Sequence, residues 1–177
     1  EDAHNYTDQP LYVKGLGFVA GAKAGNLDPA YDYTHCPEAA KAAADAGLRY
    51  AYLQFDGIGN AANSQRRVGN LFDVKLQAIE NLWNNGVDIV PVVTIVNGVN
   101  NEQVGRIIEF ALDNPRKINF LSFQPVSFTG RDEEVTPERR AAQRYTLSHL
   151  AHDVKSQTGL GEPVRDWFPI SFMGTFT

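Results

Sequence analysis

The sequence predicts an α/β fold in which parallel β-strands alternate with α-helices. Three stretches of the chain follow one plan: a helical pattern of apolar residues comes first, and a short apolar strand follows it. Each strand ends in a polar turn that contains glycine. Because parallel neighbours are joined by right-handed helical crossovers, the three units form either an open sheet or part of a (βα) barrel.

The first unit starts with an alanine-rich helix. Pro37 opens this helix and Asp45-Ala46-Gly47 closes it, since proline suits the first helical position and glycine suits the C-terminal stop. The aromatic and aliphatic stretch "LRYAYLQF" (48–55) then predicts a strand, which ends at the turn "DGIGN".

The second unit has a helix with Asn70 as its N-cap and Gly86 as its end. The strand that follows, "VDIVPVVTIV" (87–96), is apolar at nearly every position, which is typical of a parallel strand covered on both faces. Pro91 cannot donate a hydrogen bond to a neighbouring strand, so we expect a bulge or an edge-like position there.

The third unit has a helix that begins at Asn100, with Gln103 three residues later as in a capping box. The stretch "KINFLSF" (117–123) predicts the third strand. After the loop "QPVSFTGRDEEVTP", a single helix is expected from about Pro137 to Gln157, capped by Thr136.

These units define the expected domain organisation. Residues 36–160 form a partial (βα) barrel of three βα units plus a final helix. Residues 1–35 read as an irregular segment with one strand at "LYVKGLGFVA", and residues 161–177 as an aromatic, proline-rich segment without a closing helix. Since a complete eight-unit barrel takes ~250 residues, the sequence indicates a portion of a larger barrel.

Composition narrows the function classes. With 43% hydrophobic and 21% charged residues and a net charge of −5, the chain has the mixture of a soluble globular protein and no basic footprint for nucleic acid. No apolar stretch is long enough for a transmembrane segment, and the acidic start of the sequence lacks the pattern of a signal peptide. The single cysteine, Cys36, rules out an internal disulfide and suggests a reducing compartment, so we expect a cytoplasmic protein.

Polar residues gather where the three predicted strands end, at residues 54–57, 94–100 and 123–130. In parallel α/β folds, ligands bind at the carboxyl ends of the strands, so these turns predict one shared binding face. The alternative is that each turn carries ordinary turn-forming residues. His149 and His152 lie one helical turn apart, but such a pair is more often a solvated helix edge, and we predict no metal site.

These stretches resemble a known family. "AGLRYAYLQFDGI", the segment from "LFDVKLQAIENLW" to "IIEFALDN", and "INFLSFQPVSFTGR" are similar to the second half of the barrel in radical S-adenosylmethionine (SAM) enzymes. The resemblance covers roughly residues 36–160 and is greatest to the subgroup that contains the archaeal tetraether lipid synthases. The motif "FQPVSFTG", in register with "VNGVN" and "YLQFDG", is its most specific part.

The resemblance implies a partial (βα)6 barrel, with a [4Fe–4S] cluster held by three cysteines in a C-x3-C-x2-C loop and SAM bound to that cluster. This chain lacks the loop and the glycine-rich "GGEP" strand end, and it resembles strands four to six. The implied cofactors, SAM and the [4Fe–4S] cluster, therefore belong to a full-length parent that also has the missing N-terminal half-barrel. The chain alone is expected to bind neither tightly and to be inactive, while the parent takes a small-molecule or lipid substrate. Lipid-chain carbon–carbon coupling is the most specific activity that the resemblance implies.

The same resemblance implies roles for residues at the three strand ends. Arg66 matches an arginine that binds the SAM carboxylate, and Gln54 occupies the place of a serine with the same role. The full set of implied cofactor-binding residues is Gln54, Asp56, Gly57, Arg66, Thr94, Asn97, Gln124, Pro125 and Ser127. The third strand end is expected to serve adenine or substrate. The alternatives are a solvated loop charge for Arg66 and a plain strand-ending role for Gln124.

Two other interpretations stay open. In one, the chain is a non-catalytic βα module with a binding or structural role. In the other, it is an unrelated βα-barrel enzyme that binds a phosphorylated metabolite, with the loop "FTGR" (128–131) as an anion cradle.

Overall fold

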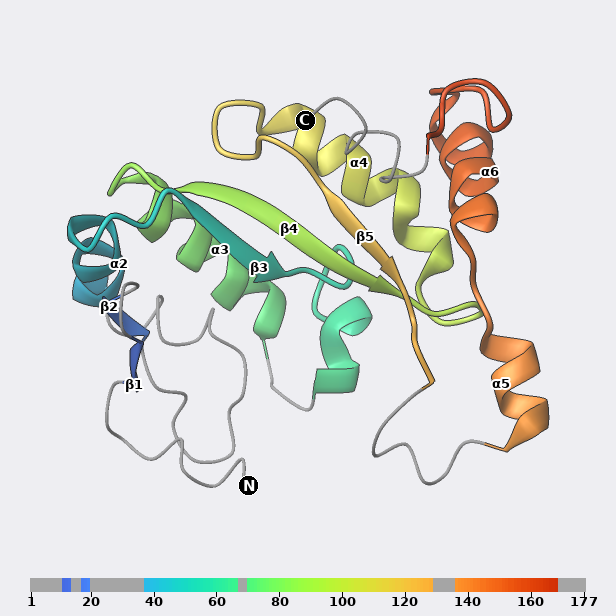
Figure 1. Cartoon of the computed structure of the whole chain (residues 1–177), viewed down its shortest axis with the longest axis horizontal. Helices are drawn as coiled ribbons and strands as arrows, with labels where there is room; N and C mark the ends of the chain where they lie inside the picture. The colour runs from blue at the N-terminus through green and yellow to red at the C-terminus, as the bar shows by residue number, and fades with distance from the viewer. Residues whose placement is uncertain (1–10, 14–16, 20–36, 67–69, 129–135, 169–177) are drawn as a thin grey trace.

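The computed structural model describes residues 11–13, 17–19, 37–66, 70–128 and 136–168 (Figure 1). It is an α/β structure with a two-stranded and a three-stranded sheet. The elements, in chain order, are β1 (Leu11–Val13), β2 (Gly17–Val19), α2 (Pro37–Asp45), β3 (Tyr50–Gln54), the 3-10 helix η2 (Ala61–Arg66), α3 (Leu71–Trp83), β4 (Asp88–Ile95), the 3-10 helix η3 (Asn101–Gln103), α4 (Val104–Asp113), β5 (Ser122–Pro125), α5 (Pro137–Gln143) and α6 (Leu147–Thr158).

β3, β4 and β5 form one parallel sheet in chain order, with β4 in the centre. Tyr50 is in register with Asp88, and Val92 is in register with Ser122. This confirms the predicted α/β class and the parallel order of the three strands. Because the strands are parallel, their carboxyl ends lie at the same edge of the sheet.

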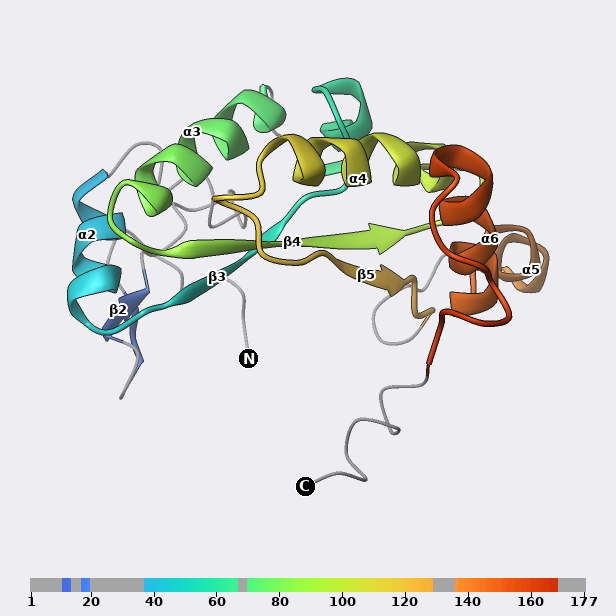
Figure 2. The same cartoon turned by 90° about the horizontal axis from the view of Figure 1, so that it is seen from above.

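The core lies between the sheet and two helices on one of its faces. Alternate residues of a strand point to the same face, and every second residue of β3 and β4 packs toward α3 and α4 (Figure 2). The fully or nearly buried core members include Leu53, Phe55, Ile89, Val93 and Ile95 from the strand segments, with Ala78, Ile79, Leu82, Val104 and Ile107 from the helices. Among the described elements, helices cover one face, which is the arrangement of a (βα) barrel rather than of a doubly wound sheet.

The other face of the sheet carries aromatic and polar side chains. Tyr50, Tyr52 and Phe120 are 46%, 65% and 50% exposed, and the rings of Tyr50 and Phe120 lie 6.1 Å apart. Val90 and Val92 are buried on this face, so β4 is covered on both sides as its sequence predicts. In a closed barrel this face would line the interior.

Pro91 lies in the central strand, so the predicted edge-like position is wrong. Its neighbours explain how the strand accepts it. Ile89 N–H donates to Lys117 O on the β5 side, so the nitrogen of residue 91 faces the same side. There the ladder contains one extra residue: two residues lie between Ile89 and Val92, whereas three lie between their partners Ile118 and Ser122. The expected bulge therefore lies in the neighbouring segment of the same chain that leads into β5, opposite the proline.

This extra residue also explains why the third strand begins later than predicted. We expected residues 117–123, but only Ile118 forms an isolated bridge before the regular pairing starts at Ser122. Pairing then continues to Pro125, which is opposite Ile95. The strand thus brings Gln124 and Pro125 into the sheet.

The final helix is two helices, so the prediction of one continuous helix is wrong. α5 ends at Gln143 and Arg144 adopts an extended conformation with φ −61° and ψ 129°. Thr146 caps α6 by accepting a hydrogen bond from His149 N at 3.3 Å. Tyr145, between the helices, is 4% exposed and belongs to the core. Tertiary contacts break the helix, since the local sequence holds neither glycine nor proline at this point.

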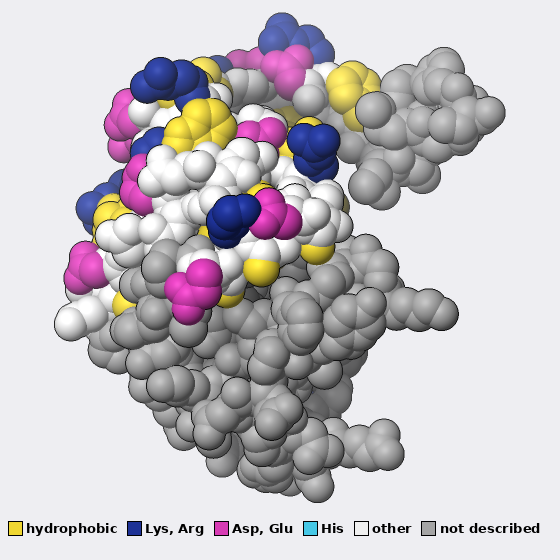
Figure 3. Space-filling view, turned by 90° about the vertical axis from the view of Figure 1, so that its left-hand side faces the viewer, with side chains coloured by type: hydrophobic (Ala, Val, Ile, Leu, Met, Phe, Trp, Pro, Cys, Tyr) yellow, Lys and Arg dark blue, Asp and Glu magenta, His cyan; other side chains and the backbone are white. Residues whose placement is uncertain are grey.

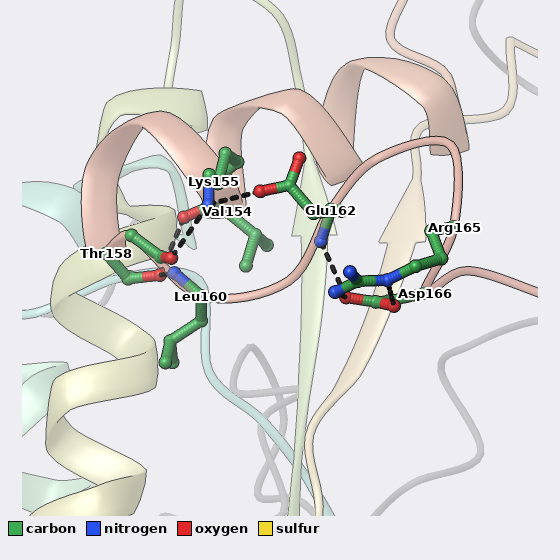
Figure 4. Close-up of polar contacts among 8 residues, drawn as sticks. Val154, Lys155, Thr158, Leu160, Glu162, Arg165 and Asp166 are labelled. Carbon is green, nitrogen blue, oxygen red and sulfur yellow. Dashed lines mark hydrogen bonds and ion pairs between the residues drawn. The ribbon is translucent and has the colours of Figure 1, made fainter.

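Two short features lie at the ends of the described chain. Near the N-terminus, β1 and β2 pair antiparallel, so the segment expected to hold one strand holds two. After α6, the chain forms a turn closed by Glu162 N–H, which donates to Asp166 Oδ2 at 2.8 Å (Figure 4). Lys155 and Glu162 form an ion pair at 2.6 Å that ties this turn to the helix. On the described part of the surface in Figure 3, acidic and basic side chains are interspersed.

Candidate cofactor-binding site

Three of the predicted site residues meet at the carboxyl ends of β3 and β4. Gln54 Nε2 donates hydrogen bonds to Asp56 Oδ1 and, at 3.2 Å, to Thr94 Oγ1. The main-chain N–H of Thr94 approaches the same Asp56 oxygen at 3.4 Å. Strand alternation places Gln54 and Asp56 on one side of the sheet, away from the helix-packed Phe55. These contacts orient a carboxylate, an amide and a hydroxyl together at one edge.

The side chain of Asn100 connects the same two strand ends through their main-chain carbonyl groups. It is 5% exposed, and its Nδ2 donates to Asp56 O at 3.0 Å and to Thr94 O at 2.8 Å. Its Oδ1 accepts from Val96 N at 2.8 Å. The capping box predicted for Asn100 and Gln103 is therefore wrong: Asn100 makes no side-chain cap, and Gln103 Oε1 instead accepts from Ile58 N at 3.3 Å. Both side chains instead form hydrogen bonds with main-chain groups at the ends of β3 and β4 and in the segments that follow them.

Gly57 is required by packing. A Cβ at this position would lie 2.6 Å from Ala62 Cβ and 3.3 Å from Gln103 Cγ, so the turn after β3 and η2 approach each other too closely for a side chain. Asn63, which is 1% exposed, holds the turn by donating to Gly57 O at 2.9 Å and Gly59 O at 2.8 Å. The turn that follows Asp56 is thus fixed on η2.

Lys75 is a buried cation that supports this turn. It lies on α3 with no exposed surface, and its Nζ donates to Asn63 Oδ1 at 3.3 Å. Our sequence reasoning missed Lys75 because it took only apolar residues as the buried stripe. The signal was present, since Leu71, Lys75, Ala78 and Leu82 follow the helical spacing of one face and all are buried.

The arginine implied by the resemblance lies at the end of η2. Arg66 is the last residue of this 3-10 helix, which follows the Gly57 turn in the chain. Its side chain lies outside what the structure describes, as does all of Arg67. Its role toward a carboxylate stays a prediction.

The third strand end lies beside this cluster. Gln124 is exposed and in register with Thr94, and Pro125 is in register with Ile95. Ser127 is exposed in the segment that continues from β5. The remaining polar residues of that predicted turn, Thr129 to Arg131, lie outside the described residues.

Asn97 follows the end of β4, as predicted, but it contacts a helix that the sequence did not place there. Its Nδ2 donates to Ala142 O at 2.9 Å, and its main-chain N–H donates to Gln143 O at 3.2 Å. These bonds satisfy carbonyl groups at the end of α5. A role of Asn97 toward a cofactor stays a prediction.

The described residues hold no cluster of three or more histidine, cysteine, aspartate or glutamate side chains that can bind a metal. His149 lies against Tyr145, with ring centroids 5.6 Å apart, and His152 is exposed. Within the same ranges, no helix combines the length and hydropathy needed to cross a bilayer.

Parallel strands covered by helices on one face, with polar residues from neighbouring strand ends joined by hydrogen bonds, define part of a (βα)-barrel protein. The chain is 39% identical over 127 residues to the 7,8-dihydro-6-hydroxymethylpterin dimethyltransferase of Methanocaldococcus jannaschii. No family model matches the chain.

The match covers 71% of this chain and 24% of the dimethyltransferase, so the chain spans about a quarter of the length of this curated relative. It supports the radical SAM superfamily that the strand-end motifs resemble, and it does not show the tetraether-lipid-synthase-like subgroup. Similarity to an enzyme over most of the chain does not favour the two other interpretations, the non-catalytic module and the unrelated barrel enzyme.

Proposed function

We propose that this chain supplies three βα units to the barrel of a longer radical SAM enzyme, called the parent enzyme below, and that its strand-end residues bind SAM. The observation that supports this most is the hydrogen-bonded cluster of Gln54, Asp56 and Thr94, which joins two neighbouring strand ends. The similarity over 127 residues to a curated enzyme supports the same family.

The side chains at this edge fit the polar groups of SAM, which are a carboxylate, an ammonium, two ribose hydroxyls and adenine. The Asp56 carboxylate accepts hydrogen bonds from hydroxyl or ammonium groups, and the Gln54 amide and Thr94 hydroxyl offer both donors and acceptors. Arg66 is proposed to pair with the SAM carboxylate, because a guanidinium binds a carboxylate through two parallel hydrogen bonds. In the cluster-bearing parent enzyme, bound SAM would supply, with one electron from the reduced cluster, the radical that removes hydrogen from a substrate.

The remaining predicted residues are assigned to the other end of the ligand. Asn97 is proposed to lie near ribose or adenine, together with the end of β4. Gln124, Pro125 and Ser127 are proposed to contact adenine or substrate. Gly57 acts indirectly, because the close contact with Ala62 fixes the turn that follows Asp56.

The iron–sulfur cluster of the family does not fit this chain. Its one cysteine cannot supply the three thiolates that hold a four-iron cluster in this family. We therefore assign the cluster to a cysteine-bearing part of the parent enzyme. The chain alone is proposed to be inactive.

Two substrate classes follow from different observations. The name of the curated relative describes dimethylation of a reduced pterin, which favours transfer of carbon to a small molecule. The resemblance of "FQPVSFTG" to the tetraether-lipid-synthase-like subgroup favours coupling of lipid chains as the second candidate. Incubating the reconstituted parent enzyme with a reduced pterin and with an archaeal lipid, in separate reactions, separates them by the product formed.

The binding role is tested by Gln124→Ala in the parent enzyme. A lost hydrogen bond is worth ~1 kcal/mol or more, so SAM affinity should fall several-fold, or SAM cleavage should become uncoupled from product formation. The cluster absorption spectrum should not change. Gln77→Ala is the matched control, since Gln77 lies exposed on α3 and bonds only to Asn81 among the described residues. Unchanged SAM affinity and turnover in Gln124→Ala would make Gln124 a strand-ending residue only.

A further inference from the structure

A pocket lies between the segment that leaves β5 and the junction of α5 with α6. Its volume is about 630 Å³, within the usual range for small-molecule sites. In Figure 1, α5 and α6 lie beyond the carboxyl end of β5. The described lining residues, which define the α5 pocket, are Val126, Ser127, Phe128, Pro137, Arg140, Ala141, Arg144, Tyr145 and Thr146.

The described lining of the α5 pocket carries two positive charges. Both charges are arginines, Arg140 within α5 and Arg144 directly after it, and none of the described lining residues is acidic. Neither guanidinium forms an ion pair or hydrogen bond with a residue in the described ranges, whereas the neighbouring Arg139 bonds to Gln143 at 3.0 Å. Two like charges that line one pocket repel each other, and an anion bound between them offsets this repulsion. The concentration of positive charge contrasts with the chain's net charge of −5.

The rest of the lining suits an anion attached to an organic group. Thr146 Oγ1 accepts from His149 N, which leaves its hydroxyl proton able to donate into the pocket. Val126, Phe128, Pro137 and Ala141 supply apolar wall. Two guanidiniums and a hydroxyl present more donors than a single carboxylate needs, and their fork geometry matches the several oxygens of a phosphate group.

Hydrogen bonds to neighbouring elements hold the segment that carries Arg140 and Arg144. Asn97 bonds to the carbonyl oxygens of Ala142 and Gln143 and so attaches the end of α5 to the end of β4. Tyr145 OH donates to Asp153 Oδ2 at 2.5 Å, which attaches the junction to α6. Val126 N–H donates to Ile95 O at 2.9 Å, so the opposite wall belongs to the sheet. A pocket held on three elements is organised before a ligand binds.

We propose that the α5 pocket binds the phosphate or diphosphate group of a small phosphorylated substrate, with Arg140 and Arg144 as its ligands. The part of this proposal that concerns substrate rests on the proposed function, because the pocket shares Ser127 with the proposed SAM and substrate face. Anion binding itself is measured on the 177-residue chain, without cluster or SAM, so the two proposals can fail separately.

The test is calorimetric titration of the chain with inorganic phosphate and with pyrophosphate in a low-salt buffer, with acetate as the carboxylate probe. We expect saturable binding that is tighter for pyrophosphate and absent for acetate. Arg140→Gln and Arg144→Gln should each weaken it by at least about tenfold, because each removes charge-assisted hydrogen bonds. Arg140→Lys, which keeps the charge and loses the fork, should give an intermediate affinity.

Arg116→Gln is the control, since Arg116 is exposed and lies outside the pocket. Circular dichroism of each variant checks the fold, which these exposed substitutions should preserve. If Arg116→Gln weakened phosphate binding equally, the binding would depend on surface arginines in general and not on the pocket. That result, acetate binding as tight as phosphate, or the absence of saturable phosphate binding would each overturn the proposal.

Discussion

Asn100 lies between the ends of two neighbouring strands and donates hydrogen bonds to the carbonyl oxygens of both Asp56 and Thr94. One buried amide therefore sets the distance between the two segments that carry the candidate site. This relationship makes Asn100 a positioning residue: it contacts the main chain behind the site, and the side chains of Asp56 and Thr94 remain turned toward each other through Gln54.

Asn100→Ala should lower the free energy of unfolding by ~2–4 kcal/mol, because three main-chain partners lose their hydrogen bonds in a buried place. Asn100→Asp keeps the acceptor for Val96 N and loses the donors, so it should also be destabilising. Urea unfolding measures both. The control is Asn119→Ala, whose exposed side chain bonds to Asp88, and which should change stability by about 0.5 kcal/mol or less. Equal values for Asn100→Ala and Asn119→Ala would contradict the role given to Asn100.

Gly57→Ala should destabilise the chain by ~1–3 kcal/mol through overpacking against Ala62. The double variant Gly57→Ala with Ala62→Gly removes the Cβ that causes the clash and should recover part of the loss. Denaturant unfolding of the two single variants and the double variant forms a double-mutant cycle. Strict additivity of the two effects would show that the contact between Gly57 and Ala62 does not limit this position.

Tyr145 predicts a loss of stability at alkaline pH. Burial raises the pKa of Tyr145 above its ordinary value of 10.0, and the hydrogen bond to Asp153 and the charge of that residue raise it further. The folded chain thus keeps a proton that the unfolded chain releases. The associated stabilisation is fully present below pH 10.0 and is lost as the pH rises above it.

The measurement compares the urea unfolding of the native chain with that of Tyr145→Phe between about pH 8 and about pH 11. The variant loses the hydrogen bond to Asp153 and should be less stable by ~0.5–1.5 kcal/mol at the lower pH. This difference should shrink as the pH rises, because phenylalanine does not titrate. A difference that stays constant over the whole range would show that Tyr145 ionises equally in both states.

The order of helices and strands was predictable because local patterns carry it. Pro37 and Gly47 bound α2 as expected: the helix begins at Pro37, and Gly47 adopts a φ of 97° that glycine accepts without strain. β4 was predicted as a strand with both faces buried, because it is apolar at nearly every position, and Ile89 to Val93 are all buried.

What the sequence did not reveal depends on contacts between distant segments. The break after α5 follows from Asn97, which bonds to its last carbonyl groups, and from the burial of Tyr145. The place of Pro91 in a central strand depends on an extra residue in the neighbouring segment before β5, about 30 positions later in the same chain. The helix break has no local sequence signal, and Pro91 signals a bulge without showing which strand carries it.

The candidate site was partly predictable for the same reason. Gln54, Asp56 and Thr94 lie at or beside strand ends, and parallel strands bring their ends to one edge whatever the loops do. The supporting roles of Asn100, Asn63 and Lys75 depend on how loops meet the helices behind that edge. The sequence predicts Asn100 as a helix cap and does not single out Asn63 or Lys75.

The central claim, that this strand edge binds SAM, is tested most directly by the affinity of the cluster-bearing parent enzyme for SAM in an Asp56→Asn variant. This change keeps an acceptor for Gln54 and removes the negative charge. Asp88→Asn is the matched control, since Asp88 lies at the opposite end of the sheet and bonds to Asn119 at 2.8 Å. Equilibrium dialysis with labelled SAM should give at least about tenfold weaker binding for Asp56→Asn, an unchanged affinity for Asp88→Asn, and the same cluster spectrum in both. SAM affinity that is the same in the native enzyme and in both variants would contradict the claim.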